Sequence, residues 1–248
     1  MGIDLDALRK KHKELMDKNA GGAKGGDFIK NFFQIKEGTS YVRILPSKRE
    51  DKEFYAETKI HRIPMENDQI KNVHCLKVHG EKCPLCDLYY ALWKTGKDED
   101  AALARSIKPS PRYYLNVVDR ETSDVKILSV PEVLFKKVIG AFVDDDFGDI
   151  TDPKKGFDFK IVKTMEGKWP RYDQSGPRPK SSTLGTDAEI ARVMESLHDI
   201  HSLVKKEDYA EVKQIAETLS VGGHINNSSN SNSEENEGGG DYLSKLRS

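Results

Sequence analysis

Apolar and polar residues alternate along the middle of the chain in a pattern that predicts short β-strands separated by turns. Helix-like patterns interrupt the strands, and Pro84 and Pro131 suit first helical turns. The predicted strands lie at residues 41–45, 54–63, 113–118, 125–128 and 157–162, and the predicted helices at 84–94, 99–107 and 131–142. This order predicts a mainly β, α+β architecture built on a small barrel.

Two helices are predicted after Gly185, as a C-terminal pair at about residues 186–220. Thr186 or Asp187 can cap the first, which we expect to run to about residue 204, and the second spans 207–219. Residues 222–248 are rich in Asn, Ser, Gly and Glu, a composition that cannot bury enough apolar surface to fold. We therefore expect a disordered tail that ends in a candidate docking peptide at 241–247.

The N-terminal segment predicts a separate arm. Residues 4–18 form an amphipathic pattern that contains the basic run Arg9, Lys10 and Lys11, and the Gly-rich residues 21–26 read as a flexible linker. A run of charged residues is usually the solvent-exposed face of a helix. Because a flexible linker follows this segment, we instead favour a role in binding another molecule for residues 1–20.

Composition narrows the possible classes of protein. The chain has 248 residues, of which 36% are hydrophobic and 33% charged, so it is not a fibre and not wholly disordered. Its 40 basic and 41 acidic residues leave a net charge of -1, so net charge alone does not point to nucleic acid. No stretch approaches the roughly 18 apolar residues of a membrane helix, and the acidic start does not resemble a signal peptide. We expect an intracellular protein.

All three cysteines lie close together and give the strongest chemical signal. Thirteen residues separate His61 from Cys75, seven separate Cys75 from Cys83, and two separate Cys83 from Cys86. A Cys-x-x-Cys turn presents two thiolates to a tetrahedral zinc ion, and Cys75 is the natural third ligand. A site with four protein ligands is closed, so we expect one structural Zn²⁺ ion.

The fourth ligand could be His61, His74 or His79. His74 is adjacent to Cys75, so on an extended segment their side chains point to opposite faces. His79 falls within the turn before the Cys-x-x-Cys motif, whereas His61 on a separate strand best closes the site. A redox Cys-x-x-Cys pair, which needs no third cysteine, and buried thiols without metal are the alternative interpretations.

Basic and aromatic residues are interleaved in two segments. Residues 101–120 carry four bases and one acid, and residues 160–180 carry six bases and two acids. This composition is typical of a groove for single-stranded nucleic acid, in which cations contact the phosphates and aromatic rings stack on unpaired bases. One ring of the Tyr113–Tyr114 pair is expected in the core. The candidate DNA-binding residues are Arg105, Lys108, Arg112, Tyr113, Tyr114, Lys163, Lys168, Trp169, Arg171 and Tyr172.

Five aspartates raise the alternative of a metal-dependent nuclease. They are Asp144, Asp145, Asp146, Asp149 and Asp152, and they do not follow EF-hand spacing. No paired histidine stands near them, so an acidic surface loop is the preferred interpretation. The sequence has no phosphate loop, nucleophile elbow or HExxH motif, and we predict neither enzyme activity nor catalytic residues.

Together these features resemble a known family over about residues 5–220. The basic arm is followed by Val42-Arg43-Ile44-Leu45-Pro46-Ser47, the His…Cys…Cys-Pro-x-Cys cluster, Tyr113-Tyr114-x-Asn116-x-Val118, Asp149-Ile150-Thr151-x-Pro153, Phe159 and Lys163, and Tyr172-Asp173. This order resembles the helix-destabilising single-stranded-DNA-binding proteins of T-even-type (T4-like) bacteriophages.

The resemblance implies an OB-fold core over residues 27–221 with an inserted zinc subdomain at about 54–107. It implies the zinc ligands His61, Cys75, Cys83 and Cys86, and the cleft aromatics Tyr113, Tyr114, Trp169 and Tyr172. Arg9, Lys10 and Lys11 match an arm that binds the neighbouring protomer along the strand. His12 and Lys13 stand where the family has hydroxyl residues, which weakens the expectation of cooperativity.

The resemblance also implies a role and a setting. It predicts a protein that coats single-stranded DNA in viral replication, recombination and repair, in the cytoplasm of an infected bacterium. Residues 225–248 carry four acids and two bases, a weaker acidic tail than the family has. Replication and recombination proteins are expected partners of Tyr242, Leu243 and Leu246. A zinc-ribbon adaptor that binds proteins and not DNA is the rival interpretation.

Overall fold

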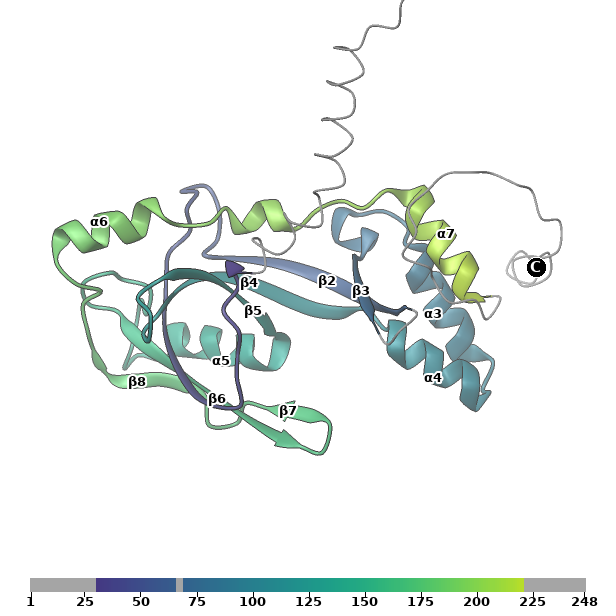
Figure 1. Cartoon of the computed structure of the whole chain (residues 1–248), viewed down its shortest axis with the longest axis horizontal. Coiled ribbons are helices and arrows are strands. Elements are labelled where there is room, and N and C mark those ends of the chain that lie inside the picture. Colours follow the sequence, from purple (N-terminus) through teal and green to yellow (C-terminus); the bar gives the residue numbers. More distant parts are fainter. Residues whose placement is uncertain (1–29, 66–68, 221–248) are drawn as a thin grey trace, which may run out of the picture. The chain divides into compact units, whose positions relative to one another are not determined.

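The chain divides into two compact units (Figure 1). The computed structural model describes residues 30–65 and 69–220, so the predicted arm with Arg9, Lys10 and Lys11, the linker at 21–26 and the tail at 222–248 lie outside the described residues. The first unit contains described residues up to Tyr55 and from Tyr114 to Ile200. The second contains Ala56 to Tyr113 and the described residues from His201 onward.

A curled antiparallel sheet forms the first unit (Figure 1). Strand β1 (Gly38–Ile44) pairs with β4 (Ser110–Asp119) on one side and with β6 (Phe157–Glu166) on the other. β5 (Val125–Pro131) pairs with β4, and helix α5 (Glu132–Val143) packs against β5 and against β8 (Gly176–Ser181). This arrangement confirms the α+β prediction and is compatible with an OB-fold.

A buried ion pair joins β1 to β6. Arg43 is fully buried opposite Asp158, and its Nη2 and Nε atoms lie 3.0 and 3.1 Å from Asp158 Oδ1. Its guanidinium also donates to the carbonyl oxygens of Asp152 and Ser182, and Arg120 Nε lies 3.2 Å from Asp158 Oδ2. Burial lowers the pKa of Arg43, while Asp158 opposes the shift. The buried charge near the end of β1 is therefore paired and hydrogen-bonded.

Two short strands after β6 are not among the strands that the sequence predicts. After β6, residues Trp169–Arg171 form β7 and residues Gly176–Ser181 form β8, and both pair with β6. β8 contains Pro177 and Pro179, which lack the N–H groups of a central strand. The pairing of β8 is irregular between Phe157 and Phe159, as suits an edge strand.

The first C-terminal helix is shorter than predicted. α6 (Asp187–Glu195) begins with a capping box at Thr186, as expected, but it ends near residue 196 instead of 204. Leu197 is buried, and the side chain of Asn116 bonds both the N–H and the carbonyl of His198. These contacts hold residues 197 and 198 against the core, and the helix ends before them.

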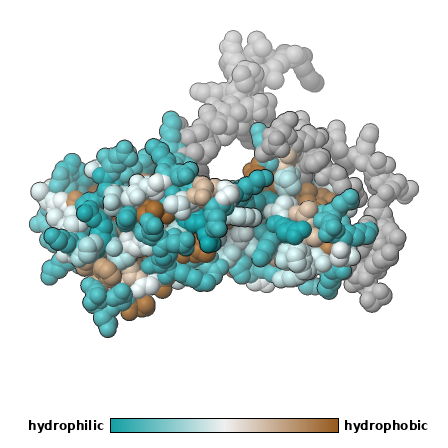
Figure 2. All heavy atoms as spheres, turned by 90° about the horizontal axis from the view of Figure 1, so that it is seen from below, coloured by the Kyte–Doolittle hydropathy of each residue, from teal (hydrophilic) through white to brown (hydrophobic). Residues whose placement is uncertain are grey.

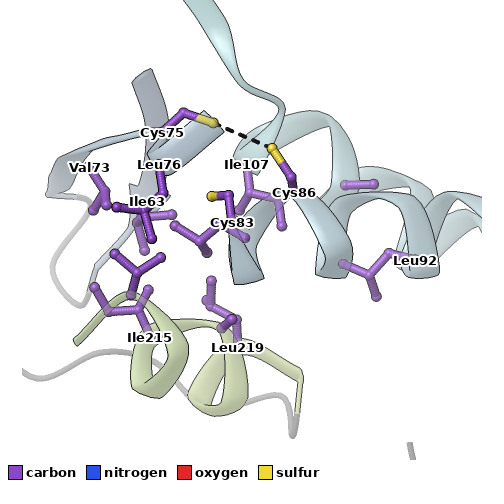
Figure 3. Packing of buried hydrophobic residues seen from close by; sticks show 14 of the residues in the cluster. Ile63, Val73, Cys75, Leu76, Cys83, Cys86, Leu92, Ile107, Ile215 and Leu219 are labelled. Carbon is purple, nitrogen blue, oxygen red and sulfur yellow. Dashed lines mark hydrogen bonds between the residues drawn. The ribbon is translucent and has the colours of Figure 1, made fainter. Parts of the chain in front are cut away.

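Helices packed around an apolar cluster form the second unit (Figure 3). β2 (Tyr55–Pro64) and β3 (Ile70–His74) make an antiparallel hairpin, and the 3₁₀ helix η2 (Leu76–His79) follows. The helices are α3 (Pro84–Lys94), α4 (Asp98–Ile107) and α7 (Tyr209–Ser220), and the 3₁₀ helix η3 (Ile200–Leu203) precedes α7. The two predicted C-terminal helices thus fall in different units.

Candidate metal centre and nucleic-acid interface

Four buried side chains converge in the second unit. His61 lies on β2, Cys75 precedes η2, Cys83 is the N-cap of α3, and Cys86 lies in its first turn. One ligand atom from each falls within 4.8 Å of every other, and all four residues are buried. Figure 3 shows Cys75 and Cys86 pointing toward each other. The cluster could hold a metal ion.

The distances fit a tetrahedral site. Cys75 Sγ and Cys86 Sγ are 3.5 Å apart, and His61 Nε2 lies 3.5 Å from Cys83 Sγ and 3.7 Å from Cys86 Sγ. Ligands at about 2.0–2.3 Å from one ion, at tetrahedral angles, lie about 3.3–3.8 Å from each other. A small shift of these side chains would therefore complete the coordination of one ion.

A backbone carbonyl fixes the orientation of the His61 ring. Nδ1 of His61 lies 2.7 Å from the carbonyl oxygen of Ile107, which can only accept a hydrogen bond. Nδ1 therefore carries a proton, and Nε2 faces the cysteines as the ligand atom. A second contact of this kind is typical of histidine ligands to metals.

Hydrogen bonds within the cluster shift the pKa values of its members. Burial lowers the pKa of His61, but hydrogen bonds to Cys75, Cys83 and Ile107 outweigh it and raise the pKa to about 9. Hydrogen bonds from Cys75 and Cys86 lower the pKa of the Cys83 thiol, while burial opposes the shift. The thiolate is the form in which a cysteine binds a metal, so the lowered pKa of Cys83 suits a ligand role.

The other candidate histidines lie outside this cluster. Nδ1 of His74 is 2.9 Å from Thr58 Oγ1, and burial lowers the pKa of His74. His79 Nε2 lies 3.3 Å from the carbonyl oxygen of Lys205. The structure therefore selects His61 from the three candidates. Redox chemistry is disfavoured because Cys83 and Cys86 are only 0% and 3% exposed, whereas a reactive thiolate needs access.

The aspartates between 144 and 152 act as turn caps. Carboxylate oxygens of Asp144, Asp149 and Asp152 accept hydrogen bonds from backbone N–H groups two or three residues later. Within residues 30–65 and 69–220, the cluster around His61 is the only group of His, Cys, Asp or Glu close enough to hold a metal. These aspartates give no support to the nuclease alternative.

An exposed tryptophan stands on the β6–β7 hairpin. The hairpin pairs Glu166 with Trp169 and Thr164 with Arg171 across a two-residue turn in which Gly167 has φ +61°. The side chain of Trp169 is 76% exposed. Arg171, two residues further on the same face, forms a 2.9 Å ion pair with Glu166. The hairpin therefore presents an indole ring beside a guanidinium group.

The three candidate tyrosines are largely buried. Tyr113, Tyr114 and Tyr172 are 9%, 7% and 8% exposed. The sequence predicts that one ring of the Tyr113–Tyr114 pair is buried in the core, and the structure buries both. The ring of Tyr114 makes an edge contact with Phe32.

The structure distributes the candidate cations over both units. Arg105 and Lys108 are exposed at the end of α4, and Arg112 is half-buried on β4. Lys168 is exposed in the hairpin turn, and Lys163 Nζ lies 3.3 Å from the carbonyl oxygen of Ile35. Lys163, Lys168, Trp169 and Arg171 belong to the first unit, and Arg105, Lys108 and Arg112 to the second.

A groove of about 430 Å³ in the first unit was not anticipated from the sequence. It lies between the segment before β1, the start of β1 and the β4–β5 turn. Its lining combines rings and cations with two acids, and includes Phe32, Phe33, Lys36, Tyr41, Arg120, Lys126, Asp119 and Glu121. Tyr41 is 41% exposed, and Arg178 lies over its ring at 5.3 Å. Tyr41 begins a predicted strand, and the strand pattern does not indicate whether its ring is buried or exposed.

The described residues on the face drawn in Figure 2 are mostly hydrophilic. On the face drawn in Figure 2, apolar residues form small patches among polar ones. Isolated apolar residues are normal at a protein surface.

In the part of the chain that the structure describes, no helix is both long and apolar enough to span a membrane.

Comparison with known proteins agrees with these observations. A family model described as "gp32 DNA binding protein like" matches residues 36–221, which is more than half of the chain. No curated protein matches the chain.

Proposed function

The chain belongs to the gp32-like DNA-binding protein family, and we propose that it binds single-stranded DNA without sequence preference, by phosphate neutralisation and base stacking. It coats and protects the strand by binding alone, with no catalytic step. The match covers both units and includes the metal cluster and the β6–β7 hairpin.

The exposed ring of Trp169 is the observation that carries this proposal. A large indole at 76% exposure has no packing role in the first unit, and bases Lys168 and Arg171 flank it. An unpaired base offers a flat apolar partner of matching size, and a neighbouring phosphate pairs with a cation. Duplex DNA buries its base faces, so this surface favours single strands.

The other candidate residues take supporting roles in the proposal. Lys163 in the first unit, and Arg105, Lys108 and Arg112 in the second, each supply positive charge for phosphates within their own unit. Tyr113, Tyr114 and Tyr172 contact bases only if the DNA-bound form exposes their rings beyond the present 7–9%. The groove at Tyr41 and Arg120 adds a second place where a ring and cations meet.

The metal in the proposal is one structural Zn²⁺ ion held by His61, Cys75, Cys83 and Cys86. Three thiols and one imidazole are soft and borderline ligands that suit zinc. Four protein ligands leave no open position for catalysis. The ion would tie β2, η2 and α3 together within the second unit.

Three further parts of the proposal rest on the family resemblance. The arm with Arg9, Lys10 and Lys11 binds the neighbouring protomer and makes coating cooperative. The C-terminal segment with Tyr242, Leu243 and Leu246 recruits replication and recombination proteins. The protein works in viral replication, recombination and repair in the cytoplasm of the infected host. Deletion of residues 1–20 should leave binding to a short oligonucleotide intact and abolish cooperative binding to a long strand.

A salt series with labelled DNA tests the proposal. Fluorescence anisotropy of labelled oligo(dT) should report binding whose log K falls linearly with log salt, by about 0.7 for each phosphate neutralised. A mixed-sequence strand should bind similarly and a duplex of equal length much more weakly. Absence of binding at low salt would favour the zinc-ribbon adaptor instead.

A further inference from the structure

An apolar groove lies between α3 and α7 in the second unit. Its volume is about 250 Å³, and its floor and walls include Leu88, Ala91, Leu92, Tyr209 and Ala216. Figure 3 shows Ile215 and Leu219 pointing from α7 into the apolar cluster. The groove adjoins this cluster, because Leu92 and Ala216 belong to both. It is separate from the four metal-binding side chains, which do not line it.

Acidic side chains surround this apolar floor. Asp87, Asp100 and Glu217 line the groove against one base, Lys213, which pairs with Glu217 at 3.6 Å. The groove therefore carries a net negative charge. A ligand with apolar side chains and a positive charge fits it, whereas a DNA phosphate does not.

The chain itself contains such a ligand close to the groove. We propose that residues 241–247 of the same chain dock in this α3–α7 groove. The segment reads Asp-Tyr-Leu-Ser-Lys-Leu-Arg, and Tyr242, Leu243 and Leu246 supply apolar groups at the spacing of one helical face. Lys245 and Arg247 outweigh Asp241, so the segment is positive where the groove is negative.

The connecting chain has a suitable length. Ser220, the last residue of α7, lines the groove, and residues 221–240 separate it from the docking segment. Twenty residues rich in Gly, Ser and Asn have a mean end-to-end distance of about 25 Å. The segment can therefore turn back into a groove that begins at its own tether, and its effective concentration there is about millimolar.

This docking goes beyond the proposed DNA binding and does not depend on it. It gives the positively charged segment 241–247 a binding site on the second unit of the same chain. A partner protein that binds Tyr242 and Leu243 would then have to displace them from the groove.

Limited proteolysis of the full-length protein tests the docking directly. Chymotrypsin cleaves after Tyr242 and releases residues 243–248, which mass spectrometry can quantify. At an effective concentration of about 1 mM and a groove affinity of about 0.1 mM, docking slows this cleavage about tenfold. The double variant Tyr209→Ser with Ala91→Lys, which removes a ring and adds a positive charge to the groove, should restore the rate measured for a free peptide of residues 238–248.

Matched variants separate docking from loss of fold. Tyr90→Ser removes a ring of similar exposure, 53% against 47% for Tyr209, from α3 outside the groove, and it should leave the protection unchanged. Glu217→Lys removes the net negative charge of the groove and should raise the cleavage rate several-fold. Leu246→Ser in the tail should do the same without touching α3 or α7.

Two results would overturn the proposal. One is an equal cleavage rate at Tyr242 in the parent protein and the double groove variant while thermal melting shows both folded. The other is protection that grows with protein concentration, because this indicates that the groove takes the tail of a second copy.

Discussion

At the scale of single residues, Trp169 combines high exposure with a place on a paired strand. The hairpin fixes its backbone, with Arg171 two residues further along the same face, so the ring is accessible to a base. Loss of this ring should remove about 1–3 kcal/mol of binding energy.

Trp169→Ala should therefore weaken binding of oligo(dT) by about 5–150-fold in an anisotropy titration at constant salt. Trp169→Phe keeps an aromatic face and should retain most of the affinity. Equal affinities of the alanine variant and the parent protein would remove Trp169 from the interface.

Single residues also show the limit of sequence reasoning. The Cys-x-x-Cys spacing was enough to predict the metal cluster, and the structure selects His61 because Ile107 orients its ring. Spacing could not show whether Tyr113 and Tyr114 are exposed, because both buried strands and stacking surfaces favour aromatic residues.

At the scale of elements, β1 and β6 are joined by charges as well as by backbone hydrogen bonds. Arg43 has its partner 115 residues away in the sequence, so the sequence does not reveal the pair. The sequence did not predict β7 and β8 for a similar reason. Both strands are short and contain proline, and they are defined by their pairing with β6 and not by a local pattern.

Asp158→Asn should destabilise the first unit by about 3–5 kcal/mol, because it leaves the buried Arg43 without its counter-charge. A urea titration followed by circular dichroism measures the change. Asp124→Asn is the matched control, since Asp124 pairs with Lys126 at an exposed position and should change stability by less than about 1 kcal/mol. A similar loss for both variants would show that the buried pair has no special role.

Removal of the metal should loosen the elements that carry its ligands. Three of the four candidate ligands lie at or beside the first turns of η2 and α3, so a bound ion would hold these elements in position. Treatment with a chelator, or Cys86→Ser, should lower the melting temperature and the helical circular dichroism signal, and added Zn²⁺ should restore them only in the chelated parent. Elemental analysis should find one zinc per chain. An unchanged melting curve after complete metal removal would contradict a structural role.

At the scale of the whole molecule, a net charge of -1 coexists with DNA binding because the charges are distributed unevenly. Acids cap the turns between 144 and 152 and line the α3–α7 groove, while bases flank Trp169. The salt dependence should therefore follow the number of bases that contact phosphates, and it should not follow the net charge.

Quenching of a single tryptophan tests the central claim most directly. Trp93 and Trp169 are the only tryptophans, so Trp93→Phe leaves Trp169 as the sole reporter. Titration of this variant with oligo(dT) should quench its fluorescence strongly, the quenching should decline as salt rises, and a duplex of equal length should have little effect. An unchanged Trp169 signal at low salt, in a protein shown to be folded, would contradict base stacking on the β6–β7 hairpin.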